Sequence, residues 1–189
     1  MIFETPALLD ELRIVTPSPF KDERGYFMEC FRNNLLEENV GYKLHFCQEN
    51  QSFSKKGVIR GLHYQLPPFA QSKLVRVVSG EIWDVAVDVR KDSPNFGKYF
   101  GITLSMENQK QLFIPRGFAH GFMAITDAIV IYHVDNYYHK PSERSIASNA
   151  HDLNISWPLP IEECILSEKD RQHPLLSKAT VFDSNSLYD

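Results

Sequence analysis

The chain has 189 residues, of which 43% are apolar and 23% are charged, and its formal net charge is −4. This length supports one substantial hydrophobic core, so we expect residues 1–189 to form a single domain. The small negative charge provides no overall basic field, which argues against nucleic acid or an anionic membrane surface as a partner.

The cysteines and residues 1–15 predict the cellular compartment of the protein. Cys30, Cys47 and Cys164 show no paired spacing, and an odd number of cysteines cannot close into intramolecular disulfides alone. Residues 1–15 contain acidic side chains where a signal peptide has a basic start and an apolar stretch. No later run approaches the roughly 18 apolar residues of a membrane span. These features predict a cytoplasmic protein that does not cross a membrane.

Short runs of β-branched and aromatic residues, broken by Gly, Pro, Asn and Asp, follow one another along most of the chain. They predict strands at residues 12–16, 26–31, 43–53, 58–64, 74–78, 81–90, 99–105, 111–115, 118–125 and 129–135. Helix is expected at residues 33–39 and in a short segment from Ser167, whose side chain is a suitable N-cap. Ser79-Gly80 predicts a tight hairpin. Many short antiparallel strands favour a mainly β fold, a jelly-roll barrel with a few short helices.

Alternation is clear in the predicted strand 81–90. The odd-numbered positions from 83 to 89 hold Trp and Val, whereas the even-numbered positions include Asp84 and Asp88. Because neighbouring side chains of a strand point to opposite faces, this pattern predicts one face in a core and one polar face.

Arg60, His63 and Lys73 lie in one proline-kinked segment, residues 56–76. A histidine suits the abstraction of a carbon-bound proton at neutral pH, and the two cations suit an oxyanion and a phosphate. The segment therefore predicts an enzyme acting on an anionic carbonyl compound, although a packed structural histidine is the alternative interpretation of His63. Arg60 and His63 differ in parity along an ideal strand, so they share a pocket only if Gly61 introduces a bulge.

Residues 114–122 read IPRGFAHGF and contain the P-x-G-x-x-H pattern that is associated with cupin barrels. In metal-binding cupins that histidine joins an upstream H-x-H and a glutamate, whereas His63 is followed here by Tyr64 and Gln65. The incomplete ligand set argues against a metal centre. His120 is instead expected to pair with Asp84, in a supporting or a purely structural network.

Other candidates are scattered along the chain. Tyr132 can deliver a proton from the face opposite His63, although tyrosines of β-proteins, Tyr138 included, are more often core or interface residues. Arg24 lies in a polar turn and would ordinarily be a solvated charge. Asp170 lies in the first turn of the predicted helix, where it either interacts with the helix dipole or orients His63 as in a carboxylate–histidine dyad.

Six segments occur in unbroken order: DERGYFME, CQENQSFSKKGVIRGLHYQLPP, KLVRVVSGEIWDVAVDVRKDSPNFGK, IPRGFAHGF, NYYH and LSEKD. Together they resemble the dTDP-4-dehydrorhamnose 3,5-epimerase family over nearly the whole chain. The resemblance implies a cupin-type jelly roll, a homodimer, no metal or organic cofactor, and a dTDP-linked 4-keto-6-deoxyhexose as substrate.

The resemblance also implies roles for single residues. His63 becomes the base, Asp170 its orienting partner, Tyr132 the proton donor and Lys73 the group that faces the keto oxygen. The substrate-binding residues it implies are Arg24, Phe27, Glu29, Gln48, Arg60, His120 and Tyr138, some of them contributed across the dimer interface, with Asp84 in support.

The chain departs from the family pattern at two places. His133 follows Tyr132 where a lysine is common, and residues 148–153 read SNAHDL where a tryptophan and an Asp-Asp-Pro stretch are common. These departures leave open a sister 3-, 5- or 3,5-epimerase that acts on another nucleotide-linked 4-keto sugar. A non-catalytic sugar-nucleotide-binding cupin and a metal-dependent cupin oxygenase are further hypotheses.

Overall fold

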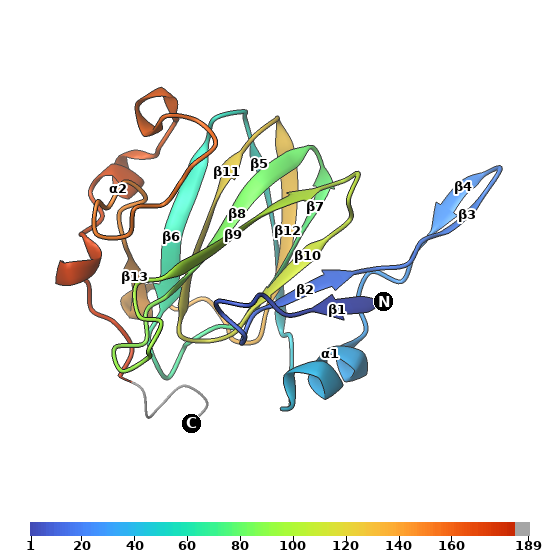
Figure 1. The fold of residues 1–189 in the computed structure, drawn as a ribbon, viewed down its shortest axis with the longest axis horizontal. Coiled ribbons are helices and arrows are strands. Elements are labelled where there is room, and N and C mark those ends of the chain that lie inside the picture. Colours follow the sequence, from blue (N-terminus) through green and yellow to red (C-terminus); the bar gives the residue numbers. More distant parts are fainter. Residues whose placement is uncertain (184–189) are drawn as a thin grey trace.

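Two antiparallel sheets face each other in the computed structural model, which describes residues 1–183 (Figure 1). The first has the order β1-β2-β10-β7-β12-β5. Its strands are β1 (Ile2–Glu4), β2 (Arg13–Thr16), β10 (Gln111–Ile114), β7 (Lys73–Ser79), β12 (Ala128–Val134) and β5 (Gln48–Ser54). The second has the order β13-β6-β11-β8-β9 and comprises β13 (Glu143–Ser145), β6 (Ile59–Gln65), β11 (Phe118–Ala124), β8 (Glu81–Asp88) and β9 (Tyr99–Ser105).

The remaining elements lie around this barrel. A hairpin of β3 (Phe20–Asp22) and β4 (Gly25–Phe27) projects away from it as an arm (Figure 1). The helices are α1 (Asn33–Val40) and α2 (Glu168–Arg171), with the 3-10 turns η1 (Lys140–Ser142), η2 (Ile161–Glu163) and η3 (Leu176–Lys178). None of the helices within residues 1–183 is long and apolar enough to span a bilayer. The prediction of a mainly β jelly roll with a few short helices is confirmed.

The core forms because each sheet contributes an apolar face to the space between them. Val75 and Leu112 from the first sheet pack with Ile82, Ala86 and Phe118 from the second. Burying a side chain of this size contributes about 1.5–3 kcal/mol. Hydrophobic contacts between the two inner faces therefore hold the sheets together.

The second sheet is buried on both faces, so the prediction of a polar face on β8 is wrong. Its outer face packs against C-terminal segments that include Leu153 and Phe182. The carboxylates of the inner face are fully buried and paired instead of solvated: Asp84 contacts His120, and Asp88 forms an ion pair with Arg90.

Several predicted boundaries are also wrong. The predicted strands 26–31 and 43–53 are shorter, because β4 ends at Phe27 and β5 begins at Gln48. Strands β1, β3 and β13 were not predicted. Ser79-Gly80 makes no hairpin, since β7 and β8 belong to different sheets. Gly80 has φ +78°, and a Cβ there would lie 2.0 Å from the Asp127 carbonyl oxygen, so glycine lets the chain cross between the sheets.

Candidate active site

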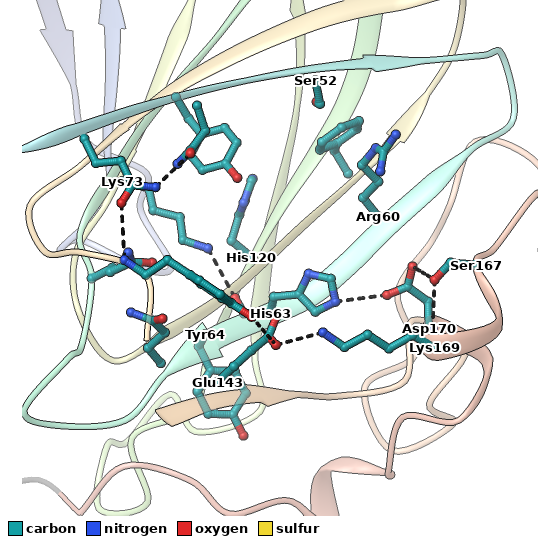
Figure 2. Close-up of a pocket in the computed structure, with 17 residues that line it drawn as sticks. Ser52, Arg60, His63, Tyr64, Lys73, His120, Glu143, Ser167, Lys169 and Asp170 are labelled. Carbon is teal, nitrogen blue, oxygen red and sulfur yellow. Dashed lines mark hydrogen bonds and ion pairs between the residues drawn. The ribbon is translucent and has the colours of Figure 1, made fainter. Parts of the chain in front are cut away.

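A cavity of about 380 Å³ opens between the two sheets (Figure 2). The first sheet lines it with Gln48, Asn50, Ser52, Lys73 and Tyr132, and the second with Arg60, His63, His120, Phe122 and Glu143. Helix α2 and its N-cap add Ser167, Lys169 and Asp170. Most of the polar side chains predicted to carry chemistry therefore meet in one place.

His63 and Asp170 form a carboxylate–histidine dyad at this cavity. The His63 Nε2 atom lies 2.9 Å from Asp170 Oδ1 (Figure 2). Ser167 caps α2: its Oγ accepts from the Asp170 backbone N–H at 3.1 Å and donates to Asp170 Oδ2 at 2.7 Å. Burial alone would raise the pKa of the Asp170 carboxyl, but the hydrogen bonds of His63 and Ser167 outweigh burial and lower it. An ionised Asp170 fixes the proton of a neutral His63 on Nε2 and leaves Nδ1 as the acceptor.

A bulge in β6 brings Arg60 into the same cavity as His63. In the β6–β11 ladder His63 pairs with His120 and Arg60 with Phe122, so the register shifts by one residue between the two pairs. Gly61 has φ +126°, and a Cβ there would lie 2.6 Å from Gly121 Cα. The predicted requirement for a glycine bulge is therefore confirmed.

Lys73 and Tyr132 reach the cavity from the sheet that faces His63. Lys73 Nζ donates to the His63 carbonyl oxygen at 3.4 Å, and its burial lowers the pKa of this amine to about 8, against the opposing effect of Asp84 and Glu143. Burial raises the pKa of the Tyr132 phenol, so the group keeps its proton at neutral pH. Because β12 and β6 belong to opposite sheets, Tyr132 and His63 line the cavity from different walls.

The expected contact between His120 and Asp84 is present. His120 Nε2 lies 2.7 Å from Asp84 Oδ1, and both side chains are buried. The pair ties β11 to β8 beneath the cavity, which His120 lines.

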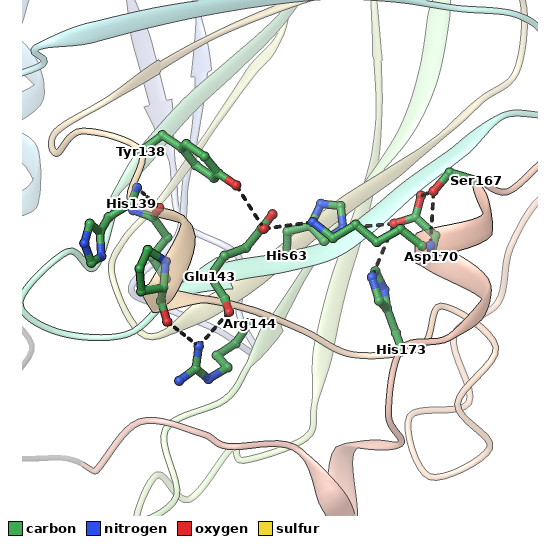
Figure 3. A network of polar contacts seen from close by, with 11 residues as sticks. His63, Tyr138, His139, Glu143, Arg144, Ser167, Asp170 and His173 are labelled. Carbon is green, nitrogen blue, oxygen red and sulfur yellow. Dashed lines mark hydrogen bonds and ion pairs between the residues drawn. The ribbon is translucent and has the colours of Figure 1, made fainter.

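The rim contains polar residues that the sequence analysis missed. Tyr138 Oη donates to Glu143 Oε2 at 3.1 Å (Figure 3), and Lys169 Nζ lies 2.8 Å from the same oxygen (Figure 2). Gln48 Oε1 accepts from the Tyr138 N–H at 3.2 Å, so a hydrogen bond joins these two predicted substrate-binding residues. Only Lys169, adjacent to Asp170 in LSEKD, carried a sequence signal; Glu143 is placed by the pairing of β13 with β6.

Three predicted binding residues do not line the cavity of their own chain. Arg24 and Phe27 lie on the projecting β3–β4 arm, and Glu29 follows it (Figure 1). Arg24 forms an ion pair with Asp22, and Phe27 is 73% exposed. Their assignment to substrate binding, with some of them contributed across a dimer interface, stays a prediction.

Comparisons with known proteins agree with this arrangement. The family model described as dTDP-4-dehydrorhamnose 3,5-epimerase matches residues 6–178. A dTDP-4-dehydrorhamnose 3,5-epimerase of Shigella flexneri is 52% identical over 163 residues, covering 86% of this chain and 89% of the relative.

Solved structures extend the likeness to three dimensions. A dTDP-6-deoxy-D-glucose-3,5-epimerase of Legionella pneumophila, in complex with dTDP-4-keto-L-rhamnose, has a TM-score of 0.89 at 46% identity and covers 94% of this chain and 93% of its own. A 3'-monoepimerase of Streptomyces bikiniensis, in complex with dTDP-quinovose, has a TM-score of 0.86 at 31% identity and covers 92% and 88%. The chain thus belongs to the dTDP-4-dehydrorhamnose 3,5-epimerase family of isomerases.

Proposed function

We propose that this protein epimerises carbons 3 and 5 of dTDP-4-dehydro-6-deoxy-D-glucose, giving dTDP-4-dehydro-L-rhamnose for dTDP-L-rhamnose biosynthesis. One observation carries the proposal: an oriented imidazole and a protonated phenol line one cavity from opposite walls. Inversion at carbon requires removal of a proton from one face and delivery of another to the opposite face. The family membership supports the choice of substrate.

The reaction follows from the ketone of the substrate. The C4 carbonyl acidifies the hydrogens on C3 and C5, so His63 Nδ1 can take either proton while the C–H electron pair moves into an enolate. The Lys73 ammonium stabilises the charge that develops on the C4 oxygen. Tyr132 then protonates the carbon from the other face and is reprotonated from solvent, to which His63 releases the proton it took, so both groups are reset for the second carbon. The substrate's own ketone supplies the activation, so we propose that neither metal nor organic cofactor takes part.

Substrate binding completes the proposal. Gln48, Arg60 and Tyr138 line the cavity and would contact the nucleotide diphosphate, with His120 and its partner Asp84 shaping the sugar end. We assign Arg24, Phe27 and Glu29 to the cavity of a second copy in a homodimer, where the arm reaches across the interface. The exposed aromatic side chains of the arm, Phe20 and Phe27, support this assignment because a monomer gains nothing from exposing them.

We further propose that residues 1–189 form one catalytic domain, although residues 184–189 lie outside the described part of the chain. A cytoplasmic location is supported by the three cysteines, all of which are free thiols, as a reducing compartment favours.

Solvent exchange tests the function directly. His63→Ala should abolish incorporation of deuterium at C3 and C5 of the keto sugar in deuterated water, because a positioned base contributes roughly 10²- to 10⁴-fold in rate. Incorporation is followed by NMR, and binding of dTDP by calorimetry should stay within a few-fold of wild type. Undiminished exchange in this variant would remove His63 as the base.

Tyr132→Phe should separate the two halves of the reaction. His63 still removes protons in this variant, so substrate hydrogen washes out while net inversion slows. Parallel measurement of deuterium content and of product by NMR distinguishes the two rates. Product formation at the wild-type rate would contradict the role of Tyr132 as proton donor.

A single inversion is the second candidate. The likeness to a 3'-monoepimerase and the histidine at position 133 favour testing it. Deuterium at only one carbon of the released sugar, with the other carbon unexchanged after complete turnover, would replace the double epimerisation by this activity.

A further inference from the structure

A second histidine lies against the dyad without a hydrogen bond to its ring. His173 follows α2, and its side chain is 5% exposed. Its Nε2 atom lies 3.6 Å from Asp170 Oδ1, and its ring meets that of His63 edge to face, with centroids 5.2 Å apart (Figure 3). Neither ring nitrogen has a hydrogen-bond partner. Buried polar atoms are nearly always paired, so a buried imidazole without hydrogen bonds, whose Nε2 atom lies near the Asp170 carboxylate, indicates an unfilled ligand position.

The spacing of the three side chains suits a small metal ion. His63, Asp170 and His173 each offer one ligand atom, and these atoms all lie within 4.8 Å of one another. Ligands bound about 2.0–2.1 Å from a tetrahedral zinc lie about 3.3 Å apart. The contacts of Asp170 Oδ1 with the two imidazoles, 2.9 and 3.6 Å, bracket that value. The remaining distance is the one between the two imidazole nitrogens. The His63 side chain is 31% exposed, so its ring can rotate to adjust this distance.

The local charge also favours a cation. Glu143 is paired with Lys169 and also interacts with Lys73. Within the described residues Asp170 has no ion pair with a lysine or arginine, so its carboxylate can serve a bound cation. A divalent ion bound to two histidines and a carboxylate, with a fourth position open to water, is a common zinc arrangement.

We propose that a divalent ion of the zinc class binds to His63, Asp170 and His173 and inhibits the enzyme. Inhibition, unlike binding, rests on the proposed function. In the active enzyme the proton of neutral His63 is on Nε2, facing Asp170, and Nδ1 accepts a proton from the substrate. Coordination of Nε2 moves that proton to Nδ1, so the ring stays neutral and no proton is released. The nitrogen that should act as base is then already protonated.

Binding is tested without substrate, by calorimetric titration of the full chain with Zn²⁺. We expect one ion per chain at this site, and His173→Phe should weaken its binding by more than about 10-fold, the lower end of the effect of losing even an indirect ligand contact. His173→Leu is the second variant if the phenylalanine perturbs folding. His151→Phe, at an exposed turn position, is the control and should bind as wild type does. Equal affinity in wild type and both His173 variants would overturn the site.

Co²⁺ gives a spectroscopic measurement that is independent of affinity. The wild-type chain should show the intense visible absorption of four-coordinate Co²⁺, the His151→Phe control should retain it, and both His173 variants should lose it. An unchanged spectrum in the His173 variants would place the ion elsewhere and overturn the proposal.

The proposed inhibition by zinc is tested by measuring turnover. Free Zn²⁺ is set with a metal buffer, because the diphosphate of the substrate also chelates the ion. We expect inhibition of wild type that a chelator reverses, and resistance in His173→Phe, whose turnover without zinc stays within a few-fold of wild type. Zinc bound at His173 without loss of turnover would overturn the inhibition. Absence of epimerisation in metal-free wild type would instead reject the proposed function and leave the calorimetric result standing.

Discussion

Lys73 shows at the scale of one residue how stability is given up for function. Its amine is buried between the sheets, and burial lowers its pKa to about 8 although Asp84 and Glu143 act in the opposite direction. A solvated lysine titrates near 10.4. Folding therefore disfavours the charged form, yet the charged form is the one that stabilises an enolate oxygen in the proposed reaction.

The pH dependence of activity should report this amine. Lys73 carries its charge below a pH of about 8 and loses it above, so kcat/KM should fall as the pH rises through about 8. Lys73→Arg should remove this basic limb, because a guanidinium stays protonated, and Lys73→Met should lower kcat roughly 10²- to 10³-fold at neutral pH. Steady-state kinetics between pH 6 and 10 would contradict the assignment if Lys73→Arg kept the same limb.

The burial of Lys73 also predicts how Lys73→Met changes the free energy of unfolding. The unfolded chain binds the Lys73 proton more tightly than the folded chain does, so burial of this amine lowers the free energy of unfolding. This loss is fully present below about pH 8 and fades as the pH rises toward the pKa of the unfolded chain. Lys73→Met should therefore be more stable than wild type at pH 7, by up to about 3 kcal/mol, with a smaller gain at pH 10. Urea unfolding at the two pH values measures the difference. A methionine variant that is less stable at pH 7 would be the contrary result.

At the scale of the element, β6 carries two functional side chains of opposite parity. Arg60 and His63 enter one cavity because the strand contains one extra residue relative to β11. Gly61 permits this with a φ of +126° and with its α-carbon packed against the backbone of Gly121 and His120. Local backbone geometry thus decides which chemical groups meet.

Gly61→Ala should damage both fold and site. The added Cβ would lie 2.6 Å from Gly121 Cα and 2.9 Å from the His120 carbonyl oxygen, and backbone atoms cannot yield as a side chain can. We expect a loss of at least about 2 kcal/mol in the free energy of unfolding, with a fall in kcat/KM of the folded fraction. Chemical denaturation and kinetics on the same sample measure both.

Gly57→Ala is the matched control. Gly57 also has a positive φ, of +80°, but the nearest atom to its Cβ would be 3.9 Å away. It should therefore show only the backbone effect of about 1–2 kcal/mol and full activity when folded. Equal losses in stability and activity for the two variants would show that the close packing of β6 on β11 is unimportant.

In the molecule as a whole, the predicted site residues fall into two groups, one at the cavity and one on the arm. The dyad, Lys73 and Tyr132 line the cavity, whereas Arg24 and Phe27 project away from the barrel that bears it (Figure 1). In the proposed twofold dimer the arm of each chain would lie at the cavity of the other, and both sites would be alike because a symmetric interface is reciprocal. In the proposed assembly each active site is therefore shared.

Hybrid dimers test this sharing. Arg24→Ala should lower kcat/KM about 10- to 100-fold by losing charged hydrogen bonds, and His63→Ala should be inactive. After subunit exchange of equal amounts, half of the dimers are mixed and each mixed dimer has one intact site, so about a quarter of wild-type activity should return. Mixing followed by a kinetic assay measures the recovery, and unmixed samples are the control. No recovery despite mixed dimers would mean that the arm serves its own chain.

Features that depend on near neighbours follow from the residues alone. Short runs of β-branched and aromatic residues predicted most strands, and Ser167 predicted the start of α2. The opposite parity of Arg60 and His63 made a shared pocket depend on a bulge at Gly61, because side-chain direction is set within a few residues. The motifs also indicated the chemistry of His63, Lys73 and Tyr132.

Which of these groups meet depends on the packing of segments that are distant along the chain. His63 and Asp170 are 107 positions apart, and their 2.9 Å contact depends on α2 packing beside β6. His173 carried no sequence signal, yet the same packing places it against both. The second sheet is buried on both faces because distant C-terminal segments cover it, which no period along β8 can reveal. Such contacts are fixed by how sheets and segments pack across long stretches of chain, and local preferences carry no information about them.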